Sequence, residues 1–247
     1  MTWRLPHLLA GEEALGTVPD LPVRRLVTDS RELHAGDVFV ALASVDGVRH
    51  GLDYLDQAIG AGAAAVLIEA APGVSPPSGS VPAVVLPTLR QRLGGIAARF
   101  YGEPADTLFT VGVTGTDGKT TTAWLIAQAL ERLGTPCRYV GTLGSGRLAS
   151  LDASRHTTPD PLRLQADLAA TRDAGMRAVA MEVSSHALDQ GRVTGLMFDV
   201  AILTNLSRDH LDSHGTETAY AAAKRRLFTE HCRGVSVLNR DDRWGAR

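Results

Sequence analysis

Short runs of aliphatic and β-branched residues alternate with stretches of helical periodicity along the chain. In the first hundred residues this pattern predicts three strands, at 37–43, 63–69 and 82–86. It also predicts two helices, at 52–61 and 88–101. The segment 72–82 contains four prolines and is predicted to be an exposed loop, because proline interrupts regular structure.

The alternation becomes more regular after the segment YGEPAD at 101–106. Strands are predicted at 108–114, 138–142, 177–183, 199–204 and 234–238, and helices at 119–133, 161–174 and 217–231. Strands separated by helices are joined by parallel crossovers, so the pattern predicts an α/β fold with a mostly parallel sheet and helices on both faces. We expect two domains, a small one at 1–105 and a second one at 106–247.

Composition narrows the class of protein. Hydrophobic residues make up 44% and charged residues 21% of the 247 residues, which is typical of a globular chain and excludes wholesale disorder. The net charge of −2 argues against binding of nucleic acid, because such proteins carry a basic excess. Cys137 and Cys232 are too few for a disulfide scaffold and indicate structural thiols in a reducing compartment. Without a signal peptide or an apolar run of about 18 residues, we expect a cytoplasmic protein that has no membrane partner.

The segment FTVGVTGTDGKTTT at 109–122 joins a predicted strand to a predicted helix. Gly115 and Gly118 allow backbone N–H groups to approach phosphate oxygens. Lys119 can reach the β- and γ-phosphates of a nucleotide, and the Thr120 hydroxyl can ligate Mg²⁺ at the start of the helix. The strict pattern G-x-x-x-x-G-K-[ST] fails because Val113 occupies the first glycine position. The order of strand, glycines, lysine and threonine still predicts a phosphate-binding loop.

Polar residues follow two further predicted strands. Glu182 ends the apolar run AVAMEV, and Asn205, Asp209 and His210 follow the next strand. Ligands of open α/β sheets bind at this edge, and a carboxylate oxygen suits Mg²⁺. Zinc is not expected, because no second His or Cys cluster completes a closed site. On spacing alone, solvated loop residues are the alternative interpretation.

Lys224 shares one face of the predicted helix 217–231 with Tyr220 and Phe228. On spacing alone, a lysine on such a face extends its ammonium group toward water. The alternative is that partial burial lowers the pKa and leaves a neutral amine. A neutral amine can react with CO₂ to form a carbamate, which is an anionic oxygen ligand.

The segment TGTDGKTTT at 114–122 resembles the phosphate loop of the Mur ligase family, TGTxGK[ST]. Four further segments resemble the MurE-type members: HTTPDP (156–161), MEVSSHALDQGRV (181–193), TNLSRDHLDSHGT (204–216) and YAAAKRRLF (220–228). The segment TDSRELHAGDVFVAL (28–42) resembles the uridine-nucleotide domain of the family. The resemblance implies an N-terminal UDP-substrate domain at 1–105 and an incomplete central ATP-binding domain at 106–247. It also implies that a C-terminal amino-acid-binding domain is absent from this sequence.

The resemblance assigns site residues position by position. It implies ATP-binding roles for Gly115, Thr116, Asp117, Gly118, Lys119, Thr120, Thr121 and Asn205. It implies substrate-binding roles for Ser30, Ala43, Ser44, Val45, His156, Thr157, Thr158, Ser184, Gln190 and Arg192, with contacts at 43–45 made through the backbone. The metal ligands would be Thr120, Glu182, His210 and Lys224 as its carbamate, and the catalytic residues Lys119, Glu182, His210 and Lys224. At position 117 the family more often has Asn, and an extra carboxylate near phosphate costs Coulomb energy.

The activity implied is ATP-dependent amide-bond formation in peptidoglycan precursor synthesis, with Mg²⁺ as cofactor. ATP phosphorylates the free side-chain carboxylate of UDP-N-acetylmuramoyl-L-alanyl-D-glutamate. The amino group of diaminopimelate, lysine or ornithine then displaces phosphate from the acyl phosphate. We expect a monomer that binds the UDP-linked substrate but turns over poorly without the missing part. The alternatives are another ligase of the superfamily, such as MurF or a folylpolyglutamate synthase, and a non-catalytic remnant that binds nucleotide-sugar.

Overall fold

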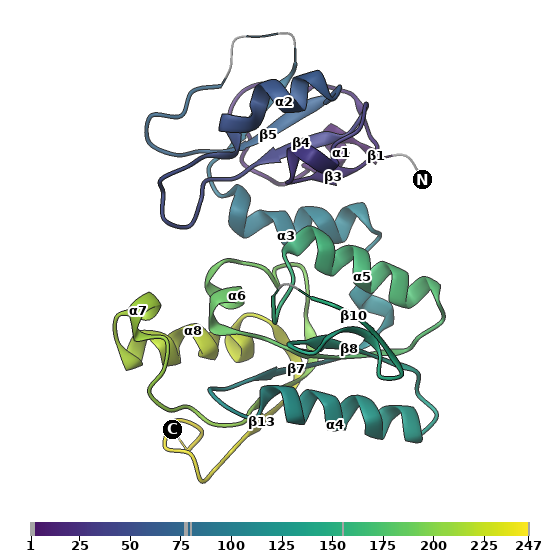
Figure 1. Ribbon diagram of the computed structural model, residues 1–247, viewed down its shortest axis with the longest axis vertical. Coiled ribbons are helices and arrows are strands. Elements are labelled where there is room, and N and C mark those ends of the chain that lie inside the picture. Colours follow the sequence, from purple (N-terminus) through teal and green to yellow (C-terminus); the bar gives the residue numbers. More distant parts are fainter. Residues whose placement is uncertain (1–2, 77–78, 80, 155, 247) are drawn as a thin grey trace. The chain divides into compact units, whose positions relative to one another are not determined.

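The computed structural model describes residues 3–76, 79, 81–154 and 156–246 (Figure 1). The chain divides into two compact units, Met1–Phe100 and Tyr101–Arg247. Each unit has a sheet and a hydrophobic core of its own. Within the described residues, no helix combines the length and the apolar character that crossing a membrane requires.

A four-stranded parallel sheet forms the centre of the first unit. Its strands, in spatial order, are β3 (Leu26–Val27), β4 (Val38–Ala41), β5 (Ala65–Glu69) and β6 (Ala83–Leu86). All residues of β4 and β5 are buried, which explains why both segments are unbroken apolar runs in the sequence. The predictions of strands at 37–43, 63–69 and 82–86 are therefore confirmed.

The helices of the first unit agree with the sequence pattern in part. The prediction of a helix at 88–101 is confirmed by α3 (Leu89–Phe100), whereas the predicted helix 52–61 divides into the 3₁₀ helix η2 (Gly51–Tyr54) and α2 (Leu55–Gly60). A capping box closes the start of η2, in which His50 Nδ1 accepts from the backbone N–H of Leu52 and Asp53 Oδ2 accepts from that of His50. Five short elements were not predicted: β1 (Trp3–Arg4), α1 (Leu5–Leu8), β2 (Pro22–Val23), β3 and η1 (Ser30–Glu32).

The second unit contains a seven-stranded sheet. Its strands, in spatial order, are β10 (Ser150–Asp152), β9 (Gly144–Arg147), β8 (Cys137–Gly141), β11 (Ala178–Glu182), β7 (Phe109–Thr114), β12 (Phe198–Leu203) and β13 (Cys232–Leu238). Neighbouring strands among β8, β11, β7, β12 and β13 pair in parallel, and β9 and β10 add an antiparallel hairpin next to β8. The five predicted strands are thus confirmed. The hairpin was missed because its strands are short and rich in glycine, which weakens a strand pattern.

Helices cover both faces of this sheet, with α4 (Lys119–Arg132) on one side and α5 (Pro161–Asp173) on the other (Figure 1). Along β11, Ala178 and Ala180 pack with α4, whereas Val179 and Met181 pack with α5, α6 (Ser185–Asp189) and α8 (Glu217–Thr229). This alternation is the period of two that a strand imposes. The helices predicted at 119–133, 161–174 and 217–231 are confirmed as α4, α5 and α8.

The remaining elements of the second unit are one-turn helices, η3 (Pro104–Thr107) and α7 (Leu211–His214). Neither was predicted, nor was the five-residue α6, because one turn is too short to show a helical period. In the predicted loop 72–82, residues 77, 78 and 80 lie outside the described residues, and the described ones form neither helix nor strand. Parallel strands with helices on both faces bring the loops after β7, β8, β11 and β12 to one edge of the sheet, and the candidate site lies there.

Candidate active site

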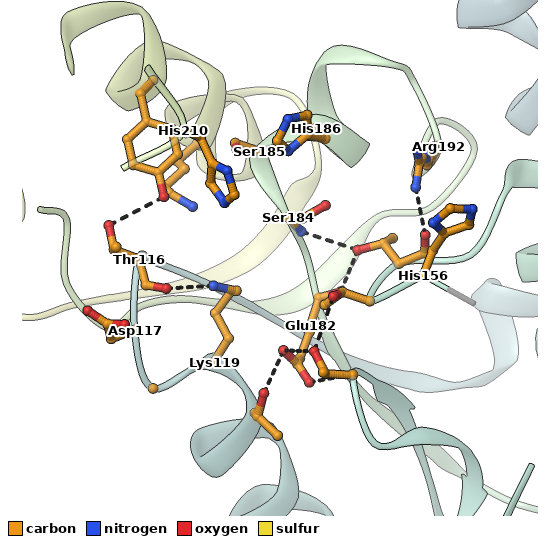
Figure 2. A pocket seen from close by; sticks show the side chains of 17 residues that line it. Thr116, Asp117, Lys119, His156, Glu182, Ser184, Ser185, His186, Arg192 and His210 are labelled. Carbon is orange, nitrogen blue, oxygen red and sulfur yellow. Dashed lines mark hydrogen bonds between the residues drawn. The ribbon is translucent and has the colours of Figure 1, made fainter. Parts of the chain in front are cut away.

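A pocket of about 440 Å³ opens at the carboxyl ends of the parallel strands in the second unit (Figure 2). Its walls contain most of the residues that the sequence assigned to nucleotide, metal and substrate: Thr116, Asp117, Gly118, Lys119, Thr120, His156, Thr157, Thr158, Glu182, Ser184, Arg192, His210 and Lys224. These residues come from segments more than a hundred positions apart. The fold thus gathers them around one cavity.

The phosphate loop connects β7 to α4, and its shape depends on glycine. Gly115 has φ +151°, and a Cβ there would lie 1.9 Å from Thr204 Oγ1. Gly118 has φ +77° and is the N-cap of α4, in the left-handed region that L side chains rarely adopt. The loop therefore turns its backbone toward the start of a 14-residue helix, where N–H groups and the helix dipole favour an anion.

Lys119 folds back over this loop. Its Nζ donates to the carbonyl oxygens of Gly115 and Thr116, at 2.9 and 2.7 Å. Burial lowers the pKa of Lys119, and the carboxylates of Glu182 and Asp117 oppose that shift. A half-buried amine beside a glycine-rich turn is placed to meet the terminal phosphates of a nucleotide.

Asn205 and Thr204 brace the phosphate loop from the end of β12. Asn205 accepts from the backbone N–H of Asp117 and donates to its carbonyl oxygen, both at 3.1 Å. Thr204 Oγ1 donates to the same carbonyl oxygen at 2.6 Å. The side chain of Asp117 takes no part in these contacts, and the residue is exposed. Asn205 therefore supports the loop and does not line the pocket. Thr121 does not line the pocket either, and it lies exposed on the first turn of α4.

Glu182 is fully buried at the end of β11 and accepts hydrogen bonds on both carboxylate oxygens. Oε1 accepts from Tyr139 Oη at 2.6 Å and from the backbone N–H of Thr142 at 2.8 Å. Oε2 accepts from Thr120 Oγ1 at 2.9 Å and from Thr142 Oγ1 at 3.2 Å. Gly141 leaves room for this arrangement, since a Cβ at that position would lie 2.2 Å from Oε1. The carboxylate is thus held in one orientation.

The oxygen ligands that Glu182 and Thr120 offer fit a magnesium ion. The Glu182 carboxylate and the Thr120 hydroxyl are hard oxygen ligands in contact with each other, and Mg²⁺ prefers one or two such ligands together with waters and phosphate oxygens. Among the described residues there is no group of three or more His, Cys, Asp and Glu side chains that could hold a metal ion by themselves.

Lys224 is 2% exposed, although it is a lysine on a surface helix. Its Nζ donates to Gly115 O at 2.7 Å and lies 4.5 Å from the centre of the Tyr220 ring. Burial, with a smaller contribution from the nearby Lys119 charge, lowers the pKa of Lys224 to about 7. The amine does not reach water in the way that spacing alone suggested, and it is partly neutral at neutral pH.

Histidines and a tyrosine line the wall above Lys224. The rings of His186 and His210 meet edge to face with their centres 4.9 Å apart, and those of Tyr220 and His214 are tilted by 49° with their centres 5.2 Å apart. His210 has φ +50°, an uncommon conformation for a residue other than glycine. Burial lowers the pKa of His186, and the neighbouring histidines and Arg192 lower it further. Burial also raises the pKa of Tyr220, whose hydroxyl lies 3.3 Å from Thr116 Oγ1.

The opposite wall joins the loop before α5 to the start of α6. Thr158 is 1% exposed; its hydroxyl donates to Glu182 O and accepts from the N–H of Ser184. Arg192 donates to Thr158 O at 3.0 Å and to the side chain of Gln190. Gln190 thus lies behind Arg192 and not on the pocket wall. A guanidinium held in this way can receive a carboxylate.

The remaining predicted substrate residues belong to the first unit. Ser30 borders a separate hollow of about 390 Å³ with Tyr54, Gln57 and residues 28–31, and its hydroxyl donates to Gln57 at 2.9 Å. The backbone of Ala43 is occupied within the unit, by Glu69 on its N–H and by Arg90 on its carbonyl oxygen. Ser44 bonds to Asp46, and Val45 is 73% exposed. The backbone of Ser44 is bonded within the loop as well, because its N–H donates to Arg49 O at 2.8 Å and its carbonyl oxygen accepts from Gly47 N–H at 3.0 Å.

Sequence reasoning missed four residues of the pocket wall: Thr142, Ser185, His186 and Tyr220. Ser185 and His186 directly follow the predicted Ser184, and Tyr220 lies one helical turn before Lys224. Their positions next to predicted site residues were the available signal. Thr142 follows β8 in a loop without any local signal.

The fold and the pocket are those of an α/β protein built around a phosphate loop. The Mur ligase middle domain matches residues 113–247. The chain belongs to the Mur ligase family.

Relatives in this family are similar over almost the whole chain. The chain is 50% identical over 228 residues to a UDP-N-acetylmuramoyl-L-alanyl-D-glutamate–2,6-diaminopimelate ligase of Pseudomonas aeruginosa, covering 92% of this chain and 46% of that protein. It is 49% identical over 250 residues to the ligase of the same name of Alkalilimnicola ehrlichii, covering 98% of this chain and 50% of that protein. A solved structure of a ligase of this name superposes with a TM-score of 0.85 and 36% identity, covering 100% of this chain and 49% of the other. The chain thus spans about half the length of the curated relatives it matches.

Proposed function

We propose that this chain carries the nucleotide and UDP-substrate sites of an ATP-dependent amide ligase of peptidoglycan precursor synthesis. The observation that carries the proposal is the convergence of Lys119, Lys224 and Glu182 on one pocket beside a glycine-dependent phosphate loop. The relatives named for this activity are about half identical to the chain. The substrate would be UDP-N-acetylmuramoyl-L-alanyl-D-glutamate, the compound in their names.

ATP would bind with its phosphates along the loop from Gly115 to Thr120. Backbone N–H groups and the start of α4 favour the negative charge, and Lys119 would move from the loop carbonyls to the terminal phosphates. Thr120, Glu182 and His210 are the residues that would hold Mg²⁺. The ion supplies charge neutralisation, which lets a triphosphate and a carboxylate approach each other.

The acceptor carboxylate would lie between the phosphate loop and the wall formed by Thr157, Ser184 and Arg192. Arg192 would bind a substrate carboxylate bidentately, with Gln190 and Thr158 fixing its orientation. The hollow beside Ser30 would receive the uridine end of the substrate in the first unit. Of Ala43, Ser44 and Val45, backbone contacts would come from Val45, because the backbone groups of Ala43 and Ser44 are already bonded.

The reaction would proceed in two steps, formation of an acyl phosphate and then of the amide. An oxygen of the D-glutamyl side-chain carboxylate attacks the γ-phosphorus of ATP, and ADP leaves as the acyl phosphate forms. The amino group of the third amino acid attacks the acyl carbon, a proton leaves the nitrogen, and inorganic phosphate is released with the amide. Diaminopimelate is the amino acid in the relatives' names, and we propose it over lysine and ornithine.

Lys224 would act as a carbamate. Its amine is buried and partly neutral, and it lies against Gly115 O and the Tyr220 ring, with the Lys119 charge nearby. Reaction with CO₂ replaces a cation that burial disfavours by an anion, which the Lys119 ammonium can stabilise. The carbamate oxygens would add to the magnesium ligands.

A calorimetric titration tests the substrate assignment. The chain is titrated with UDP-N-acetylmuramoyl-L-alanyl-D-glutamate, with UDP-N-acetylglucosamine as control, and with a non-hydrolysable ATP analogue in excess Mg²⁺. We expect saturable binding of the dipeptide compound that the control does not reproduce, and binding of the analogue that Lys119→Met weakens. Binding of both UDP compounds with equal affinity would favour the non-catalytic nucleotide-sugar protein. Absence of binding by folded chain would contradict the proposal.

Carbamylation has a separate test, because Lys119 and Lys224 are the two lysines of the sequence. Incubation with ¹³C-labelled bicarbonate should give a carbamate signal in the carbon NMR spectrum that survives in Lys119→Arg and is lost in Lys224→Arg. A signal that disappears only in Lys119→Arg would contradict the assignment to Lys224.

A further inference from the structure

His214 links Ser185 and Asp189 beside the pocket, through a hydrogen bond to the serine and a close contact with the carboxylate. His214 Nδ1 lies 3.1 Å from Asp189 Oδ2, and His214 Nε2 lies 3.0 Å from Ser185 Oγ. A carboxylate only accepts, so the contact with Asp189 favours a hydrogen on Nδ1, and Nε2 shares a hydrogen bond with the Ser185 hydroxyl. Both ring nitrogens of His214 are therefore engaged.

Two of the three residues are closed to water, whereas the Asp189 side chain is 43% exposed. The His214 side chain is 5% exposed and Ser185 is 1% exposed. Asp189, at the end of α6, also lies 3.8 Å from Arg226 Nη1, and Arg226 donates to Leu188 O at 2.7 Å. Buried polar groups require their partners, so the buried hydrogen bond between His214 and Ser185 stabilises this arrangement of α7 against α6.

His210 depends on this arrangement. It is the N-cap of α7, and its carbonyl oxygen accepts from the backbone N–H of His214 at 3.0 Å. A helix of four residues is not stable alone, and a left-handed histidine persists only where the surroundings hold it. The side-chain anchor of α7 nearest to His210 in the hydrogen-bond network is His214.

The imidazole of His210 faces the pocket from this support. Figure 2 shows His210 and His186 along the side of the pocket opposite Lys119. The edge-to-face contact of the two rings joins His210 to α6, the same helix that holds His214 through Ser185 and Asp189. A displacement of α7 would therefore move His210 relative to Glu182, which precedes α6 in the chain.

We propose that His214 is a positioning residue for His210: the Asp189–His214–Ser185 chain fixes α7 on α6 and so holds the His210 imidazole at the magnesium side of the pocket. The role toward magnesium rests on the proposed function. The order serine, histidine and carboxylate also occurs in hydrolases that use the serine as a nucleophile. Ser185 is nearly inaccessible, which favours positioning over attack.

The first test reads the histidine rings of the whole chain by NMR, without any ligand. His214 should show an Nδ1–H hydrogen that exchanges slowly with water. In His214→Leu, which fills a similar space but makes neither polar contact, the His210 ring signals should shift toward those of a mobile histidine. His7→Leu is the matched control, because His7 is exposed in the other unit and should leave the His210 signals unchanged. Unchanged His210 signals in folded His214→Leu would overturn the proposal.

The second test is a double-mutant cycle on magnesium-dependent binding of a non-hydrolysable ATP analogue. Loss of the support should weaken binding about 10-fold or more in excess Mg²⁺ and leave binding in EDTA unchanged, an effect that general loosening of the fold would not give. His210→Ala should have the same effect, and the double variant should lose no more than either single one. Asp189→Asn keeps a carbonyl oxygen that accepts from Nδ1 and should restore most of the loss seen in Asp189→Leu.

Three results separate the outcomes. Losses in His210→Ala and His214→Leu that multiply in the double variant would overturn the proposal, because the two residues would then act independently. Covalent labelling of Ser185 by a fluorophosphonate probe would overturn it in favour of a nucleophilic serine. Absence of nucleotide binding by the unsubstituted chain would refute the proposed function, and the ring signals of His210 would then decide the positioning role alone.

Discussion

Lys119 and Lys224 donate to the same acceptor, the carbonyl oxygen of Gly115, at 2.9 and 2.7 Å. Two ammonium groups on one oxygen repel each other, and both are removed from water. The pKa of each lysine is accordingly lowered, by burial above all, and that of Lys224 is also lowered by the Lys119 charge. The pocket thus holds two neighbouring amines whose charged forms repel each other, and a bound polyphosphate or a carbamate would relieve this repulsion.

The lowered pKa of Lys224 makes stability depend on pH. Between the folded value of about 7 and the ordinary value of 10.5, the unfolded chain binds a proton that the folded chain does not. The free energy of unfolding therefore rises with pH across that window, by at most about 1.4 kcal/mol per pH unit, and it falls as the pH is lowered toward 7. Lys224→Met should abolish this slope.

Urea denaturation of both proteins in CO₂-free buffer at pH 7.5, 8.5 and 9.5 measures the effect as the difference in the free energy of unfolding. Lys119→Met should raise the pKa of Lys224 and flatten the slope at its lower end, since one source of repulsion is gone. Parallel pH profiles of the wild-type chain and Lys224→Met would contradict a lowered pKa.

Gly141→Ala should disrupt the support of Glu182. The new Cβ would lie 2.2 Å from Glu182 Oε1 and 2.3 Å from Tyr139 Oη, so one of the strongest contacts of the carboxylate must move. Overpacking of this kind costs about 1–3 kcal/mol. We expect a lower free energy of unfolding and weaker magnesium-dependent nucleotide binding.

Gly95→Ala in α3 is the matched control for this substitution. A Cβ at Gly95 meets nothing within 4 Å, and alanine in a helix is favoured over glycine by about 0.5–1 kcal/mol. Gly95→Ala should therefore stabilise the chain in the same denaturation experiment. Equal stabilities of Gly141→Ala and the unsubstituted chain would show that the carboxylate is not confined.

His231 should make the chain sensitive to acid. It is 7% exposed, its Nε2 has no hydrogen-bond partner, and burial lowers its pKa from 6.5. As pH falls below 6.5, the unfolded chain takes up a proton that the folded chain resists, so stability decreases until the folded pKa is reached. His231→Asn keeps a donor near the position of Nδ1 but does not titrate.

The measurement is the difference in the free energy of unfolding between wild type and His231→Asn at pH 8, 6.5 and 5. The asparagine variant should be less stable at pH 8, by about 1 kcal/mol for the lost packing. That deficit should shrink or reverse by pH 5. A constant difference across the three values would refute a buried neutral imidazole.

Local patterns in the sequence predicted the sheet edge that carries the site. The phosphate loop is a contiguous strand, turn and helix, and Glu182 ends an apolar strand, so each was visible without the fold. Thr142 and His214 were not, because their contacts with Glu182 and Ser185 bridge segments 40 and 29 residues apart. The burial of Lys224 depends in the same way on Gly115, which lies 109 residues before it. Hydrophobic periodicity shows which residues share a face of one helix or strand, but it does not show which distant segments come into contact.

Asp117→Asn should strengthen nucleotide binding. The backbone of residue 117, not its side chain, is bonded to Asn205 and Thr204, so the substitution leaves the brace of the loop intact. The exposed carboxylate repels the phosphates, and its removal should tighten binding of the ATP analogue about 3-fold to 5-fold at low ionic strength, equivalent to about 1 kcal/mol. At 1 M salt, where the Debye length is about 3 Å, the gain should disappear. Asp56→Asn, an exposed carboxylate in the other unit, should change nothing. Calorimetric titration at both salt concentrations decides it: a gain that persists at high salt would mean that Asn at this position makes a direct contact with the nucleotide.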